Sequence, residues 1–223
     1  MLPWKELGRA DIPGENSPLV LLQRGAEFVV RRGAVALMAS GAHASEERLA
    51  EDGCAFAAAL AAPRVLVGGL GLGYTLAAAL RVLPAGSEVI VSELFPAVVD
   101  WNRGPLGPLA GHPLADPRVR LALGDVRDAI PSEGPFDVIL LDVDNGPDGF
   151  TRRDNAALYS DEGLLACRRA LRPRGVLAVW SVAPDDAFAR RFVRAGFEVR
   201  ETRVRARPGK GATHVLWFGT RLR

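Results

Sequence analysis

Three carboxylates of this chain stand where buried strands are predicted to end. Glu93 and Asp142 each close an apolar run, and Asp125 follows another apolar run after a single glycine. The carboxyl ends of parallel strands meet at one edge of a sheet, and open α/β sheets bind their ligands there. A carboxylate at this edge can accept hydrogen bonds from ribose hydroxyls or an adenine amine, or take the proton of an amine. We therefore expect the three acids to share one site.

A glycine-rich turn precedes these acids and predicts that the ligand is a nucleotide or nucleoside. The apolar run Val65–Val67 leads into Gly69-x-Gly71-x-Gly73, and the helix-compatible run Leu76–Leu83 follows. A strand, a glycine turn and a helix start bring the backbone, with its unpaired N–H groups, close to a ligand. Nicotinamide dehydrogenases and S-adenosylmethionine enzymes both use such turns. A dehydrogenase would leave the later Gly124-Asp125 and the C-terminal hairpin unexplained.

Strands alternate with helical segments from Arg64 onward, which predicts a doubly wound, mostly parallel sheet with right-handed crossovers. The tail has two alternating runs around a Pro-Gly-Lys-Gly turn, which predicts a hairpin that adds an antiparallel strand at the sheet edge. The expected strands are 65–67, 88–92, 119–122, 137–141 and 175–180, the hairpin arms are 198–206 and 214–219, and the expected helices are 76–83, 97–103, 126–130, 161–171 and 185–195.

Residues 1–60 have a different pattern and are expected to form a small N-terminal β element with a connecting helix. The helix is expected over 44–60, with Ser45 as its N-cap and acidic residues in its first turn. We assign 61–223 to a Rossmann-like nucleoside-binding domain. The expected N-terminal strands are 19–23, 27–31 and 35–38.

Bulk composition describes an ordinary globular α/β protein of 223 residues with 48% hydrophobic residues and a net charge of +2. This near-neutral charge predicts no nucleic-acid or membrane partner, and the basic alternation Arg203, Arg205, Arg207 is interpreted as one solvated strand face. The three histidines are scattered without ligand spacing, so no metal is expected. The N-terminus lacks the pattern of a signal peptide. The two cysteines show no metal-ligand spacing and are expected to be reduced, which predicts a cytoplasmic location.

The order of the motifs resembles the spermidine synthase (polyamine aminopropyltransferase) family, within the superfamily of class I S-adenosylmethionine-dependent methyltransferases. The resemblance extends from about Leu19 to Trp180, and it includes the β element before the Rossmann-like domain. The pieces that carry it are the glycine loop, Glu93, Gly124-Asp125, Phe136–Asp142 with Gly146-Pro147, Leu158-Tyr159 and Leu171–Leu177.

This resemblance implies a transferase whose co-substrate is S-adenosylmethionine or its decarboxylated form, acting on a small amine acceptor. Members of the family are commonly dimers or tetramers, and a homodimer is the expectation here. Glu93 would hold the ribose, Asp125 the adenine, and Asp142 would be the base near the acceptor amine. The implied nucleoside-binding residues are Gly69, Gly71, Leu72, Gly73, Glu93, Leu94, Asp125 and Val126, and the implied acceptor-side residues are Glu46, Asp144, Asn145 and Tyr159.

Four positions depart from the family pattern, and all of them face the transferred group or the acceptor. Leu72 replaces the loop aspartate that grips the aminopropyl amine, and Asn145 replaces a second acid. Ser45 stands at the family's tyrosine and Trp180 at its glutamine. These departures predict an acceptor other than putrescine. Two alternatives remain open: a methyltransferase that uses intact S-adenosylmethionine, which Leu72 favours, and a non-catalytic nucleoside- or partner-binding protein.

Overall fold

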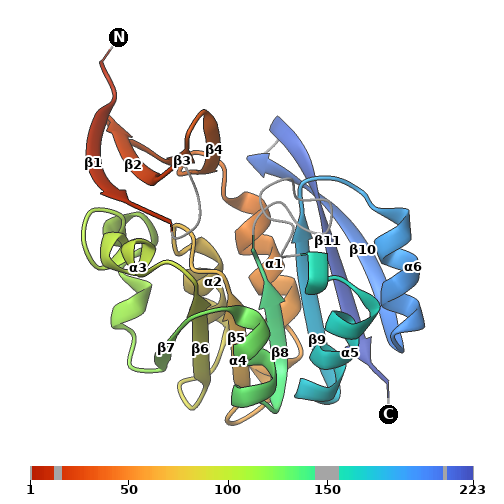
Figure 1. Ribbon diagram of the computed structural model, residues 1–223. Helices are drawn as coiled ribbons and strands as arrows, with labels where there is room; N and C mark the ends of the chain where they lie inside the picture. Colours follow the sequence, from red (N-terminus) through yellow and green to blue (C-terminus); the bar gives the residue numbers. More distant parts are fainter. Residues whose placement is uncertain (1, 13–16, 144–155, 208–209, 223) are drawn as a thin grey trace.

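The computed structural model describes residues 2–12, 17–143, 156–207 and 210–222, and within them the chain forms two β-sheets. A four-stranded antiparallel sheet lies at the N-terminus, beside one end of a seven-stranded sheet that is flanked by helices (Figure 1). The order of the larger sheet is β10-β11-β9-β8-β5-β6-β7. Its strands are β5 (Arg64–Gly68), β6 (Glu88–Glu93), β7 (Val119–Leu123), β8 (Phe136–Leu141), β9 (Leu171–Ser181), β10 (Phe197–Arg207) and β11 (Lys210–Arg221).

The larger sheet confirms the predicted Rossmann-like, doubly wound fold. Strands β5 to β9 pair in parallel, whereas β11 pairs antiparallel with both β9 and β10. The C-terminal hairpin therefore adds two strands, with β11 inside the sheet and β10 at its edge. All six residues of β8 are buried, as expected for a central strand covered on both faces by helices.

Helices cover both faces of the sheet and form two hydrophobic cores. One core joins α1, α2 and α3 to the sheet and to the N-terminal β element, and the other joins α4, α5 and α6 to the opposite face. The helices are α1 (Ala44–Cys54), α2 (Tyr74–Val82), α3 (Pro96–Arg103), α4 (Val126–Glu133), α5 (Asp161–Ala170) and α6 (Asp186–Arg194), and short 3-10 turns lie at Ala57–Ala59, Gly107–Ala110 and Pro113–Ala115.

The N-terminal sheet has one strand more than the sequence pattern predicted. Its strands are β1 (Lys5–Ala10), β2 (Leu19–Arg24), β3 (Glu27–Arg32) and β4 (Val35–Ala39), paired in chain order. Strand β1 lacks a buried apolar alternation, and it is held by antiparallel pairing with β2 and by packing of Gly8 against Trp101 of α3. Backbone pairing and a tertiary contact thus define this strand, and neither leaves a periodic signal in the sequence.

The connecting helix begins at Ala44 as expected, but its C-terminal end and its N-cap residue differ from the prediction. Helix α1 stops at Cys54 instead of Leu60, and a 3-10 turn follows. The residue at the N-cap is His43, whereas Ser45 lies inside the first turn and is fully buried. Ser45 cannot cap the helix because its hydroxyl is bonded to side chains of β9 and β11. The division of the chain at residue 60 stays a prediction, since α1 itself packs on the larger sheet.

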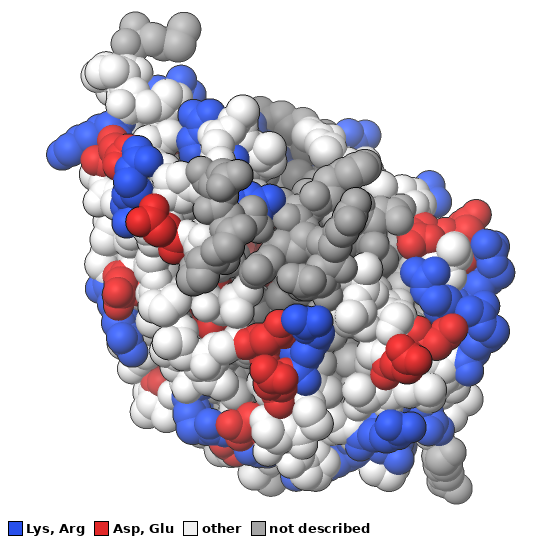
Figure 2. All heavy atoms as spheres, in the orientation of Figure 1, with Lys and Arg blue, Asp and Glu red and all other residues white. Residues whose placement is uncertain are grey.

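On the face in Figure 2, basic and acidic side chains lie beside one another at several places, with uncharged surface between them. Arg203, Arg205 and Arg207 are exposed on edge strand β10, as predicted. Among the helices described, none has the length and apolar character needed to cross a bilayer.

Gly53 fixes the distance between α1 and the sheet, and this contact generates a stability prediction. A Cβ at this position would lie 2.7 Å from Leu140 Cδ2 and 3.2 Å from Ala178 Cβ, so a larger residue must displace the Leu140 side chain or push the helix outward. We expect Gly53→Val to destabilise the protein by about 1–3 kcal/mol in chemical denaturation. The control is Glu51→Val, which places the same side chain on the exposed face of α1. Equal loss in both variants would contradict this packing role.

Candidate active site

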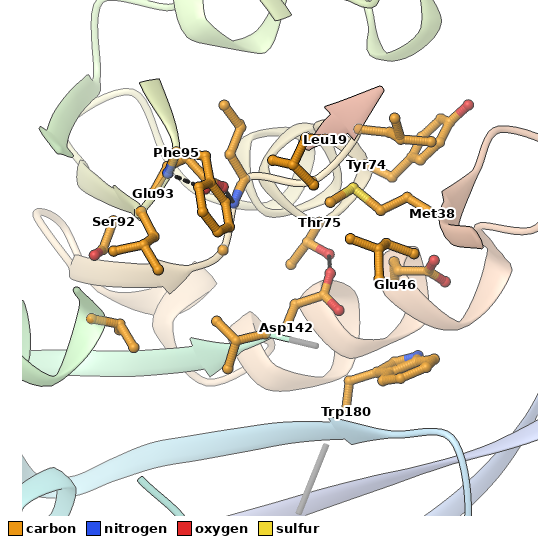
Figure 3. Close-up of a pocket in the computed structure, with 18 of the residues that line it drawn as sticks. Leu19, Met38, Glu46, Tyr74, Thr75, Ser92, Glu93, Phe95, Asp142 and Trp180 are labelled. Atoms are coloured by element: carbon orange, nitrogen blue, oxygen red, sulfur yellow. Dashed lines mark hydrogen bonds between the residues drawn. The ribbon is translucent and has the colours of Figure 1, made fainter. Parts of the chain in front are cut away.

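A pocket lies at the carboxyl edge of the larger sheet, between the strand ends, the start of α2, the start of α1 and strand β4 (Figure 3). The ends of β6, β5 and β8 are in register there, because Gly68 pairs with both Ser92 and Leu141. The next residues along the three strands, Glu93, Gly69 and Asp142, therefore lie side by side. All three contribute to the pocket wall.

Gly69 is the closest point between the glycine loop and β8. Its φ is 87°, and an added Cβ would overlap the carbonyl oxygen of Asp142. The Gly69 N–H donates to Ser92 O over 2.9 Å, and the Asp142 N–H donates to Gly68 O over 2.9 Å. Positive φ and the lack of space both require glycine here. The loop thus turns directly over the ends of its two neighbouring strands.

Glu93 connects the glycine loop to the corner after β6. Its Oε2 accepts the Leu70 N–H at 3.0 Å and its Oε1 accepts the Phe95 N–H at 2.8 Å. Burial raises the pKa of this carboxyl, and the backbone donors oppose that shift. The side chain lines the pocket, so the remaining lone pairs of its oxygens can accept hydrogen bonds from a ligand.

Asp125 also lines the pocket, and it is at the same time the N-cap of α4. Its Oδ1 accepts the Arg127 N–H at 2.8 Å, and its Oδ2 lies 2.6 Å from Arg127 Nη2. A helix cap was the plain alternative to an adenine contact, and the structure shows that the cap forms. An adenine amine at this position would share the carboxylate with Arg127, so the adenine role remains a prediction.

Asp142 and Glu46 form an acidic pair in the part of the pocket away from Glu93. Thr75 at the start of α2 donates a hydrogen bond of 2.5 Å to Asp142 Oδ2 (Figure 3). Burial raises the pKa of Asp142 to about 6, although the Thr75 bond opposes the shift. Burial, and then the charge of Asp142, raise the pKa of Glu46 to about 7. Carboxyls with pKa values near neutrality can take up a proton at physiological pH.

The wall around this acidic pair is mostly apolar. Leu37 and Met38 of β4 contribute to it, together with Tyr74 of α2 and Trp180 at the end of β9. The Tyr74 hydroxyl donates to Ser40 O at 3.2 Å and so holds the end of β4 against α2. The N-terminal β element therefore closes one side of the pocket.

Most of the residues predicted from the sequence meet in this pocket. Those that line it are Glu46, Gly69, Gly71, Leu72, Glu93, Leu94, Asp125, Val126 and Asp142. Gly73 is not among the lining residues and serves instead as the N-cap of α2, with a φ of 87°. Asp144 and Asn145 lie outside the described residues.

The prediction for Tyr159 finds no support in its position. Its side chain is buried and packs edge-on against Phe188, with ring centroids 5.9 Å apart, in the core on the opposite face of the sheet. The hydroxyl donates to Val143 O at 3.4 Å, which supports the backbone next to Asp142. The described contacts therefore give Tyr159 a packing role, and a substrate contact stays a prediction.

Sequence reasoning missed Thr75 and the contribution of strand β4. Thr75 follows Gly73 by two residues and so lies in the first turn of the helix after the glycine loop, facing the strand ends. A hydroxyl at that place was a usable signal. Met38 and Leu37 carried no such signal, because their position depends on how the two sheets pack. Among the described residues, no group of three or more His, Cys, Asp or Glu could hold a metal ion.

Comparisons with known proteins agree with this geometry. Residues 110–213 match a family described as S-adenosyl-L-methionine-dependent methyltransferase. Over 124 residues, the chain is 36% identical to a polyamine aminopropyltransferase of Nitrosomonas europaea, and over 124 residues 35% identical to one of Prochlorococcus marinus. The matched segment covers 54% and 55% of this chain but only 36% and 41% of these relatives. The resemblance to aminopropyltransferases is thus confirmed over about half of the chain.

Solved structures confirm the fold over nearly the whole chain. The spermidine synthase of Thermotoga maritima aligns with a TM-score of 0.74 at 18% identity, covering 96% of this chain and 72% of that one. A putative O-methyltransferase of Klebsiella pneumoniae aligns with a TM-score of 0.56 at 20% identity, covering 80% of each chain. At these identities the likeness shows the shared fold.

The raised pKa values of Asp142 and Glu46 give a prediction about stability and pH. An acid whose pKa is higher in the folded than in the unfolded protein holds its proton longer in the folded state, so stability falls as pH rises between the two values. For Asp142 and Glu46 that window runs from about 4 to about 7. Asp142→Asn removes the loss of stability that comes from ionising a buried Asp142. It also removes the repulsion between the carboxylates of Asp142 and Glu46.

We therefore expect Asp142→Asn to gain stability relative to the wild type between pH 4 and pH 8, by about 1–3 kcal/mol. Urea denaturation at several pH values measures the difference between the two proteins. Asp128→Asn is the control, because Asp128 is exposed on α4 and outside the pocket. A stability difference that does not change with pH would contradict the buried acidic pair.

Proposed function

We propose that this chain is a transferase that moves an alkyl group, the aminopropyl group, from an adenosyl sulfonium donor to a small amine. The observation that carries the proposal is the convergence of the glycine loop, Glu93, Asp125 and the pair Asp142–Glu46 on one pocket. Glu93 and the loop backbone would bind the nucleoside. The matched segment covers less than half the length of these two polyamine aminopropyltransferases.

The charge of the pocket supports a cationic donor and a cationic acceptor. Its ionisable acidic residues are Glu46, Glu93, Asp125 and Asp142, and no Lys or Arg is among the described residues that line it. A sulfonium and an ammonium ion gain from such surroundings, whereas a donor carboxylate would face carboxylates and find only backbone N–H groups. This favours decarboxylated S-adenosylmethionine as the donor.

Asp142 would act as the base in the reaction. The sulfonium is already activated, so the protein mainly has to position the two partners for in-line attack. The acceptor ammonium must lose a proton before its nitrogen can attack, and a carboxylate with a pKa near neutrality suits that role. Thr75 would orient the carboxylate through its hydrogen bond to Oδ2.

The acceptor would be an amine other than putrescine. Trp180 and Ser45 bond to each other at 3.0 Å, so neither is free to hold the far end of a linear diamine. Leu37, Met38 and Trp180 instead offer an apolar wall. We infer an acceptor with one amine and an apolar remainder. A homodimer and a cytoplasmic location remain expectations.

A methyltransferase that uses intact S-adenosylmethionine is the second candidate. Leu72 supports it, because the loop has no acid to hold an aminopropyl amine, and the matched methyltransferase family over residues 110–213 supports it as well. In that case the amino group of the donor would lie near Asp142. The two candidates differ in which donor binds more tightly.

Calorimetry with S-adenosylmethionine, its decarboxylated form and methylthioadenosine tests the donor. We expect the decarboxylated donor to bind at least tenfold more tightly than S-adenosylmethionine, because only the latter brings a carboxylate into an acidic pocket. Glu93→Gln should weaken all three ligands together, and the exposed-acid control Asp128→Asn should weaken none. Tighter binding of S-adenosylmethionine would favour the methyltransferase, and no binding of any nucleoside would refute both candidates.

Turnover with a panel of amines tests the role of Asp142. Mass spectrometry should detect methylthioadenosine as the leaving product, with apolar monoamines ahead of putrescine. We expect Asp142→Asn to lower kcat by about 100-fold or more while the donor affinity stays within a few-fold. Unchanged turnover would remove Asp142 from the mechanism. A product of S-adenosylhomocysteine would establish methyl transfer instead.

A further inference from the structure

The buried hydroxyl of Ser45 lies between three polar side chains from three different elements. Its Oγ is 2.6 Å from Glu46 Oε2, 2.8 Å from His214 Nδ1 and 3.0 Å from Trp180 Nε1. Ser45 itself has no exposed surface. Glu46 lines the pocket, whereas His214 on β11 is not among the lining residues and is partly exposed. The hydroxyl thus connects Glu46 in the pocket wall to the partly exposed His214.

Hydrogen-bond counting allows only two arrangements of this cluster. The indole N–H of Trp180 is a donor only, so it occupies one lone pair of Ser45 Oγ. When Glu46 is ionised, Ser45 donates to it, and His214 must then carry a proton on Nδ1. When Glu46 is protonated, it donates to Ser45, and Ser45 donates to an unprotonated Nδ1. A proton on Glu46 Oε2 and a proton on His214 Nδ1 are therefore mutually exclusive.

We propose that Glu46, Ser45 and His214 form a proton relay that carries the proton of the acceptor amine from the pocket to the protein surface. This inference rests on the proposed function, because the amine supplies the proton. It assigns to Ser45 and His214 a role in proton transfer, although neither lines the pocket.

The proton and the electrons balance along this route. The acceptor ammonium gives its proton to the Asp142–Glu46 pair, and the freed nitrogen lone pair forms the new C–N bond. The C–S bond breaks, and its electron pair stays on sulfur, which becomes a neutral thioether. With His214 in its Nε2–H form, Glu46 then passes a proton to Ser45 Oγ while the hydroxyl proton moves to His214 Nδ1. His214 releases its Nε2 proton to water, which leaves Glu46 ionised and Nδ1 protonated. Proton exchange with water returns the ring to its Nε2–H form before the next turnover.

The surroundings of His214 suit a transient carrier. Burial lowers the pKa of its imidazole, so the ring is neutral at pH 7 and gives up an added proton readily. The Trp180 ring holds it edge-on, with centroids 4.6 Å apart. Glu46 of α1 is connected to His214 through Ser45 Oγ. Its partner on β10 is Val204, and the flanking Arg203 and Arg205 alternate to the other side of that strand.

Other titratable groups near the cluster are engaged elsewhere. Glu47 is 3.3 Å from Arg81 Nη2 and 3.4 Å from His43 Nδ1. The charges of Glu46 and Glu47 help to raise the pKa of Tyr74, behind the larger effect of burial, so this phenol stays neutral near pH 7. Asp142 acts on the cluster through its charge, which helps to raise the pKa of Glu46.

Kinetics of His214→Asn provide the first test, measured with an amine that the turnover panel identifies as an acceptor. We expect kcat to fall by about tenfold with KM and donor affinity nearly unchanged, the solvent deuterium isotope effect to rise, and added imidazole to restore part of the rate. Ser45→Ala should give a similar loss, and the double variant should be no slower than either single one, because the steps are in series. His112→Asn and Ser87→Ala are matched controls outside the pocket.

NMR of the His214 ring nitrogens provides a second test that does not depend on activity. Between pH 6 and pH 8, the neutral ring should change from the Nε2–H to the Nδ1–H form as Glu46 ionises, and Glu46→Ala should abolish this change. A single tautomer across the range, or an unchanged kcat and isotope effect in His214→Asn, would overturn the relay. If the relay is overturned but Asp142→Asn abolishes turnover, the proposed function stands without the relay. If the tautomer change is observed but no amine is turned over, the coupling between Glu46 and His214 is supported and the proposed reaction is refuted.

Discussion

The C-terminal end of β5 has to turn between the ends of its two neighbouring strands, and only glycine fits at that point. Gly69 has a positive φ and no space for a Cβ beside the Asp142 carbonyl. The backbone bonds that join Gly69 to Ser92 and Asp142 to Gly68 hold the three strand ends together. The glycine loop, Glu93 and Asp142 are neighbours for this reason, and the pocket exists because they are.

Buried acids without buried bases are the second feature of the site. The carboxylate of Glu93 is partly compensated by two backbone N–H groups, and that of Asp142 by the Thr75 hydroxyl. The Ser45 hydroxyl and the backbone N–H of Glu46 itself lower the pKa of Glu46, but burial outweighs both and the pKa rises to about 7. An acidic pocket of this kind is less costly when a cation occupies it or when its acids take up protons. Both outcomes fit the proposed sulfonium donor and ammonium acceptor.

The N-terminal β element and α1 add walls to the carboxyl edge of the sheet and so form the pocket. Strand β4 supplies its apolar wall, and α1 brings Glu46 opposite Asp142. Gly53 lets α1 approach the sheet closely, and the bonds of Ser45 to β9 and β11 fix the start of the helix. Contacts with the larger sheet thus position the start of α1, and with it Glu46, at the pocket.

The sequence alone determined the order of strands and helices from Arg64 onward, the glycine turn, and the acids at the strand ends. These features are local, because each depends on the periodicity of one segment or on the residue that follows it. Tertiary structure decided the rest. Strand β1 and the bonded position of Ser45 arise from partners far along the chain. The raised pKa values of Glu46 and Asp142 come from burial that two sheets and a helix create together, and no single segment of the sequence records that burial.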